Sequence, residues 1–151
     1  MSANAGGGLV WGVKASFLGY VTRAEGEITV AEGADVAEGQ QAFVFPASDE
    51  KGKFTGQVGF DAHGGMLKVT IADPWIEIAD DGNATLSVVN PAKLATDRSQ
   101  RITIAALGDI VPQGDGTAKA NAVLTMHGVW LLGNVYAPGD DLDPVVFPWA
   151  G

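Results

Sequence analysis

The spacing of hydrophobic positions near the start of the chain predicts one short helix. The large apolar residues there fall four, three and one positions apart, at Val13, Phe17, Tyr20 and Val21. This spacing places them on one face of a helix, on which Ser16 lies one turn before Tyr20. We expect the helix to end near Arg23, because Gly26 follows and the sequence then becomes strand-like.

Beyond Gly26 the hydrophobic pattern changes to short alternating or β-branched runs that are typical of strands. Eight such runs are residues 27–31, 42–45, 54–60, 67–72, 76–79, 84–89, 101–107 and 118–126. A turn at 136–139 and a closing edge strand at 145–147 complete the pattern. The sequence therefore predicts a mainly β protein, an antiparallel β-sandwich or barrel-like fold with one or two short helices.

Length and composition favour one domain. The 151 residues, of which 46% are hydrophobic, suffice for one core and are too few for two domains of ordinary size. We therefore expect a flexible leader at residues 1–8 and a single domain at 9–151. The 21 glycines are spread along the chain, which suits strands joined by tight turns, and hairpin loops are expected at 81–83 and 114–116.

Charge and residue usage exclude several classes of function. A net charge of −9 argues against nucleic acid or an anionic membrane surface as a partner. The absence of cysteine excludes disulfides and thiolate metal sites. No apolar stretch reaches the roughly 18 residues needed to cross a bilayer, so we expect no membrane insertion by this chain. Residues 1–8 lack the basic start and apolar centre of a signal peptide, which leaves a cytoplasmic location open.

Few residues in the chain are able to carry chemistry. There are two histidines, His63 and His127, and two tyrosines, Tyr20 and Tyr136. No nucleophile elbow, phosphate-binding loop or HExxH pattern occurs, so hydrolase and phosphoryl-transfer functions have no support. Taken alone, His63 is typical of a hairpin turn beside two glycines, and Tyr20 is typical of half-buried packing.

Four segments follow one another along the chain: the opening segment at 9–21 with Trp-Gly-Val-Lys, the segment at 58–67 with His-Gly-Gly, Ile-Ala-Asp-Pro at 71–74, and Tyr-Ala-Pro-Gly at 136–139 with Leu-Asp-Pro-Val-Val-Phe at 142–147. Taken together and in this order, they resemble the HtaA-type haem-binding domain of actinobacterial haem-uptake proteins. The resemblance covers nearly the whole chain. It implies a mostly antiparallel β fold in which a short helix presents the haem ligand.

The resemblance also implies a site. Tyr20 matches the family's axial ligand to ferric haem b, His63 matches the histidine that hydrogen-bonds to this ligand, and Ser16 matches a serine placed to meet a haem propionate. Phe17, Met66 and Tyr136 are candidates for contacts with the ring, although Phe17 equally fits the protein core. Further candidates for the propionate edge are Lys14 and Arg23. His127 has no counterpart in the family and is either a surface residue or a second ligand.

The function implied is haem capture and transfer in iron acquisition, without catalytic turnover. Its partners would be haem and the donor or acceptor proteins of an uptake system, at the cell surface or in a secreted form. A haem held from one side leaves the other face exposed, which suggests a haem-dependent homodimer.

Two alternatives stay open at this stage. The first is a haem-dependent peroxidase-like enzyme, against which the sequence offers no distal acid–base pair. The second is a haem-independent adhesive or sugar-binding β-sandwich that uses its tryptophans, Trp11, Trp75, Trp130 and Trp149, as stacking surfaces.

Overall fold

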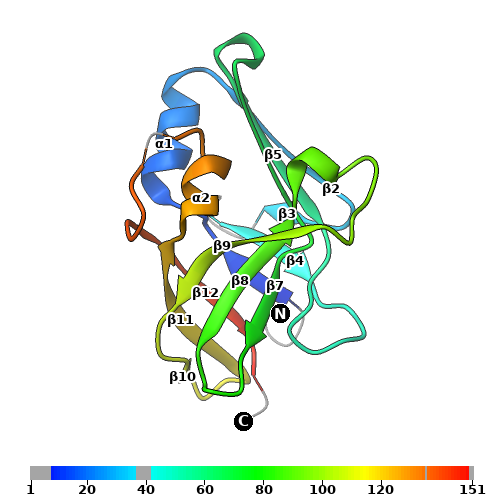
Figure 1. Ribbon diagram of the computed structural model, residues 1–151, viewed down its shortest axis with the longest axis vertical. Helices are drawn as coiled ribbons and strands as arrows, with labels where there is room; N and C mark the ends of the chain where they lie inside the picture. The colour runs from blue at the N-terminus through cyan, green and yellow to red at the C-terminus, as the bar shows by residue number, and fades with distance from the viewer. Residues whose placement is uncertain (1–7, 37–41, 135, 150–151) are drawn as a thin grey trace.

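The computed structural model describes residues 8–36, 42–134 and 136–149. These residues form two antiparallel β-sheets and two short α-helices, as Figure 1 shows. The mainly β, antiparallel fold class predicted from the sequence is confirmed. Apart from Gly8, the leader predicted at residues 1–8 lies outside the described residues.

The larger sheet has nine strands in the order β3-β4-β1-β12-β11-β9-β8-β7, with β10 paired to β11. Its strands are β1 (Gly8–Trp11), β3 (Asp35–Val36), β4 (Phe43–Pro46), β7 (Trp75–Ile78), β8 (Ala84–Val89), β9 (Arg101–Leu107), β10 (Val111–Pro112), β11 (Thr117–Leu124) and β12 (Asp141–Pro148). The smaller sheet has three strands in the order β2-β5-β6. They are β2 (Glu27–Ala31), β5 (Gln57–Ala62) and β6 (Leu67–Ala72).

The helices lie together at one end of the molecule (Figure 1). Helix α1 (Ala15–Arg23) connects the larger sheet to the smaller one, and α2 (Met126–Leu131) follows β11. The hairpin of β5 and β6 rises at the same end, and its tip is the 3₁₀ turn His63–Gly65. Strand β10 and the turn that leads into β11 lie at the opposite end of the molecule.

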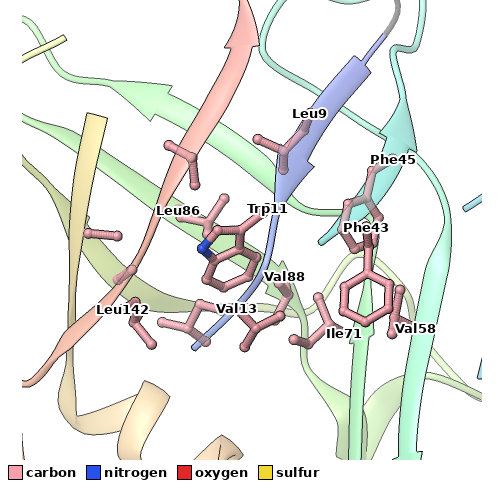
Figure 2. Packing of buried hydrophobic residues seen from close by; sticks show 14 of the residues in the cluster. Leu9, Trp11, Val13, Phe43, Phe45, Val58, Ile71, Leu86, Val88 and Leu142 are labelled. Carbon is pink, nitrogen blue, oxygen red and sulfur yellow. The ribbon is translucent and has the colours of Figure 1, made fainter. Parts of the chain in front are cut away.

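A core of aromatic and aliphatic side chains joins the helix to both sheets. The Phe17 ring of α1 packs edge-on against Phe60 of β5 at 5.1 Å between centroids. Phe60 in turn packs edge-on against Phe43 of β4 at 5.8 Å, so the two sheets face each other across these rings. Figure 2 shows Trp11 within the same cluster, where it is 1% exposed. Burial of the indole ring removes a large apolar surface from water, and its N–H finds a partner because it donates to the Asp143 carbonyl at 2.8 Å.

Local pattern predicted most strands and failed where packing overrides it. The predicted strands at 27–31, 67–72, 84–89 and 101–107 coincide with β2, β6, β8 and β9. The edge-strand prediction at 145–147 is wrong, because β12 pairs with both β1 and β11 inside the larger sheet. Strand β1 was not predicted. The strand predicted at 118–126 ends at Leu124, because Thr125 is the N-cap of α2 and its hydroxyl accepts a hydrogen bond from Gly128 N.

Candidate functional site

Tyr20 and His63 meet at the helical end of the molecule. Tyr20 Oη lies 2.6 Å from His63 Nε2, a hydrogen bond between residues 43 positions apart in the sequence. The two rings are 5.5 Å apart between centroids and inclined by 57°. Tyr20 is 37% exposed, so the side chain that His63 holds is accessible from solvent. The structure therefore brings together the two residues that the sequence singled out.

The packing of α1 determines where Tyr20 points. Phe17 and Val21 are fully buried and fix one face of the helix against the core. The helix ends in a Schellman motif, in which Gly26 N donates to Val21 O and Glu25 N donates to Thr22 O. Glu25 rather than a glycine takes the left-handed position of this motif, with φ of 58°. Gly26 serves a different purpose: a Cβ there would lie 2.4 Å from Asp61 O, so only glycine lets the end of α1 approach β5 this closely.

An unusual backbone conformation at the hairpin tip carries His63 to the tyrosine. His63, Gly64 and Gly65 have φ values of 56°, 65° and 94° in succession. The two glycines adopt these angles without a steric penalty, whereas a residue with a Cβ costs about 1–2 kcal/mol in this region. The ladder of β5 and β6 closes at Ala62 and Leu67, which fixes the base of the tip. His63 is therefore a strained residue placed at a site, a combination that often accompanies function.

An open pocket of about 320 Å³ lies beside the pair. Its lining consists of Tyr20, His63, Met66, Leu67, Leu132 and Gly133. Gly133 follows α2 and packs so closely on the hairpin that a Cβ would come within 3.0 Å of Leu67 Cδ1. Sequence reasoning missed Leu67, Leu132 and Gly133. The last two could not be found because this part of the lining depends on α2, and a six-residue helix leaves too short a periodic pattern to detect.

The other predicted site residues are distributed unevenly. Met66 lies on the pocket and is 90% exposed. Ser16 and Arg23 are exposed on α1, on either side of Tyr20 in the sequence. Phe17 is 0% exposed and packs in the core, so it offers no surface to a ligand in this structure.

Three remaining candidates lie outside the pocket lining. Tyr136 is half-buried, and the Lys14 ammonium lies 5.1 Å from the centre of its ring. Lys14 Nζ also donates to the Asp141 carbonyl at 2.5 Å, so this cation is already engaged by the protein. His127 is exposed on α2.

The site presents one phenol oxygen beside an apolar surface. A phenol oxygen that shares a proton with an imidazole is a hard ligand suited to ferric iron. Leu67 and Met66 supply apolar surface of the kind that covers a flat, hydrophobic ligand, and Leu132 lines the same pocket at 2% exposed. Within the described residues, no group of three or more His, Cys, Asp or Glu side chains is arranged to hold a bare metal ion. These residues fit haem, whose porphyrin supplies the remaining ligands to its iron.

A transmembrane helix is lacking from the described part of the chain, where neither α1 nor α2 has the length and apolarity to span a bilayer.

Comparisons with known proteins agree with the fold and with the resemblance noted in the sequence. Residues 6–148 match the family described as Htaa. The C-terminal domain of HtaA from Corynebacterium glutamicum is similar at 26% identity, with a TM-score of 0.67, and the match covers 93% of each chain. Comparison with curated proteins finds no match.

Two further solved structures share the fold at lower identity. Heme binding protein HtaB from Corynebacterium glutamicum is 19% identical, with a TM-score of 0.67 over 94% of this chain and 91% of that one. The N-terminal domain of HtaA from the same organism is 21% identical, with a TM-score of 0.67 over 96% of this chain and 97% of that one.

Proposed function

The chain belongs to the HtaA family, and on this premise we propose that it binds ferric haem b, with Tyr20 as the axial ligand and His63 as its hydrogen-bonding partner. The observation that carries this proposal is the 2.6 Å contact between Tyr20 Oη and His63 Nε2 at the edge of an apolar pocket. The likeness to a solved heme binding protein supports the choice of ligand.

Each residue of the pair has a distinct task in this proposal. A phenol keeps its proton at neutral pH in water, so a phenolate ligand needs both a nearby positive charge and a hydrogen-bond donor. Ferric iron supplies the charge when haem is bound, and His63 Nε2–H supplies the donor. The imidazole also fixes the direction of the phenolate oxygen, as partners of metal ligands commonly do. Because a hard anionic oxygen favours the ferric state, Tyr20 suits a carrier of haem better than an oxygen binder.

The pocket and its rim hold the rest of the haem. The exposed apolar surface of Leu67 and Met66 would cover one face of the macrocycle, where burial of apolar surface contributes roughly 25 cal/mol per Å². We assign the propionates to Ser16 and Arg23, both exposed on α1, because a hydroxyl and a guanidinium donate hydrogen bonds to carboxylates. Phe17 and Lys14 take no part, because Phe17 is buried and Lys14 already bonds to Asp141.

The domain captures and passes on haem without turnover. No arginine occurs in the pocket lining drawn from the described residues, so a peroxidase-like distal acid–base pair has no support there. Rapid peroxide-dependent oxidation above that of free haem would favour the enzyme instead. We place this activity at the cell envelope, with a haem donor or acceptor protein as the partner. The open pocket leaves the other haem face free, and a larger particle size with haem than without it would reveal the haem-dependent dimer.

The test is a titration with ferric haem followed by absorption. We expect saturable one-to-one binding with a tyrosinate-type ferric spectrum in the wild type. Tyr20→Phe should lose this spectrum and more affinity than His63→Ala, for which a roughly 10–100-fold loss is expected. Tyr136→Phe, which alters the other tyrosine and keeps its ring, should retain the tyrosinate bands. A tyrosinate spectrum that survives in Tyr20→Phe and vanishes in Tyr136→Phe would move the ligand to Tyr136.

A further inference from the structure

Helix α1 has no cap of its own. The residue before its first turn is Lys14, whose side chain cannot accept a hydrogen bond and makes no cap bond. The first amide N–H groups of any helix need partners from outside the helix. Here Ala15 N donates to Asp143 Oδ1 at 3.1 Å, from a residue 128 positions later in strand β12. The carboxylate also carries the charge that the positive end of a helix favours.

Asp143 holds the turn before the helix as well. Val13 has a φ of 62°, an angle that is exceptional for a β-branched residue, and its side chain is 1% exposed. Asp143 N donates to Val13 O at 2.9 Å, and Asp143 O accepts from Trp11 Nε1 at 2.8 Å. The carbonyl, amide and carboxylate groups of Asp143 therefore bind, in that order, a side chain of β1, the strained turn at Val13 and the first turn of α1. A strained backbone persists only where its surroundings determine it in this way.

We infer that Asp143 is a positioning residue for Tyr20, because its carboxylate fixes the start of the helix that presents the ligand. This inference rests on the proposed function of Tyr20. Tyr20 lies in α1 five positions after Ala15, so a shift at the first turn is carried along the helix to the phenol. The hydrogen bond between Tyr20 and His63 spans only 2.6 Å, and a displacement of 1 Å removes it.

Two substitutions separate the carboxylate from the backbone groups of Asp143. Asp143→Ala removes the acceptor for Ala15 N, whereas Asp143→Asn keeps an acceptor oxygen and loses only the charge. Asp115→Ala is the matched control, because Asp115 Oδ1 accepts from Thr117 N at 3.0 Å in the turn between β10 and β11, away from α1. All three variants are compared for thermal stability, so that a general loss of stability is separated from a change at the site.

The first readout is the Nε2 chemical shift of His63 in haem-free, ¹⁵N-histidine-labelled protein. Wild type and Tyr20→Phe define the bonded and unbonded values. We expect Asp143→Ala to move towards the Tyr20→Phe value, Asp143→Asn to lie between, and Asp115→Ala to match the wild type. The second readout is the rate at which haem is lost to an excess of apomyoglobin, which should rise about fivefold in Asp143→Ala, as loss of a helix cap would give.

The two proposals fail separately. A wild-type His63 shift and an unchanged rate of haem loss in Asp143→Ala would overturn the positioning role and leave the proposed function intact. If the wild type does not bind haem, the proposed function is overturned, and the chemical shifts still decide whether Asp143 positions Tyr20. If Asp143→Ala does not fold, Asp143→Leu carries the test, because it keeps the approximate shape of the side chain without an acceptor, and a His63 shift equal to that of the wild type contradicts the inference.

Discussion

At the end of the molecule where β10 meets β11, the left-handed backbone positions fall on Gly114 and Gly116, with φ of 81° and 89°. At the end that carries the candidate haem site, they fall on Val13, Glu25, His63 and Asn134 as well as on glycines. The turn between β10 and β11 is stabilised by its own residues, since Asp115 bonds to Thr117 two positions on. The start of α1 is stabilised by Asp143, from the other end of the sequence. At the β10 end the residues suit the backbone conformation that they adopt. At the site end, contacts with distant segments hold the backbone in conformations that its residues disfavour.

The difference shows where the fold holds residues in backbone conformations that are unfavourable for them. A residue with a Cβ at positive φ costs about 1–2 kcal/mol, and the packing around it must exceed that cost. Val13 is held by a buried side chain and by Asp143, and His63 is held by the β5–β6 ladder. Val13 lies just before the helix that carries Tyr20, and His63 is itself the other member of the pair. We therefore expect substitutions at this end to change ligand binding, and equivalent substitutions at the β10 end to change stability alone.

The largest effect is expected from filling the close contact between α1 and β5. In Gly26→Ala the new methyl group would lie 2.4 Å from Asp61 O and 2.9 Å from Val21 Cγ1, so the helix must move away from the hairpin. We expect a loss of about 3 kcal/mol in the free energy of unfolding, as overpacking gives, together with weaker haem binding. The measurements are urea unfolding of the haem-free protein and the haem titration.

The control for this substitution is Gly114→Ala at the opposite end. A Cβ there meets nothing within 4 Å, and only the positive φ of 81° opposes it. We expect a cost of about 1 kcal/mol and unchanged haem affinity. Equal haem affinities in Gly26→Ala and Gly114→Ala would show that the close approach of α1 to β5 has no part in the site.

A smaller effect, with opposite signs for binding and stability, is expected at His63. In His63→Gly the φ of 56° no longer carries a steric cost, so the haem-free protein should be at least as stable as the wild type. The Tyr20 hydroxyl loses its partner, and haem affinity should fall roughly 10–100-fold. Unfolding in urea and the haem titration measure the two changes.

His127→Ala is the comparison for His63→Gly, because His127 is the other histidine and is exposed on α2. We expect haem affinity to stay unchanged when it is removed. A protein in which His63→Gly loses more than about 1 kcal/mol of stability would contradict the view that His63 is strained. Loss of haem binding in His127→Ala would revive its interpretation as a second ligand.

The same contrast explains what the sequence could predict. Strands β2, β6, β8 and β9 follow from local alternation and turn chemistry, and the turn at 114–116 has the glycines that its backbone needs. The helix and its tyrosine follow from apolar spacing. The contact between Tyr20 and His63 does not follow from any local pattern, and it was anticipated only through the family resemblance, because long-range register decides it.

Other features of the site end were beyond local reasoning for specific reasons. Gly26 looks like a helix terminator in the sequence, but Glu25 takes the left-handed position and Gly26 serves a close approach. Strand β12 looks like an edge, but its neighbours β1 and β11 come from distant parts of the chain. The residue that caps α1 is Asp143, and no sequence pattern at residues 13–16 indicates that the cap comes from so far along the chain. Each of these depends on contacts between segments that only the assembled fold defines.

The smallest effect is a pH dependence confined to the β10 end. Hydrogen bonds from the Thr117 hydroxyl and the Thr117 amide to Asp115 lower the pKa of this carboxyl from its ordinary value of 3.8. Because the folded-state pKa lies below the unfolded value, the stabilisation is present above the unfolded pKa and is lost as pH falls through the folded pKa. Asp115→Asn should therefore be less stable than the wild type near neutral pH, and the difference should shrink below about pH 4. Because Asp115 lies at the surface, the change is modest.

Urea unfolding at a series of pH values measures this change in stability, and the haem titration at neutral pH should not distinguish the variant from the wild type. A difference in haem affinity would show that the two ends are coupled, and would contradict the expectation that substitutions at the β10 end change stability alone.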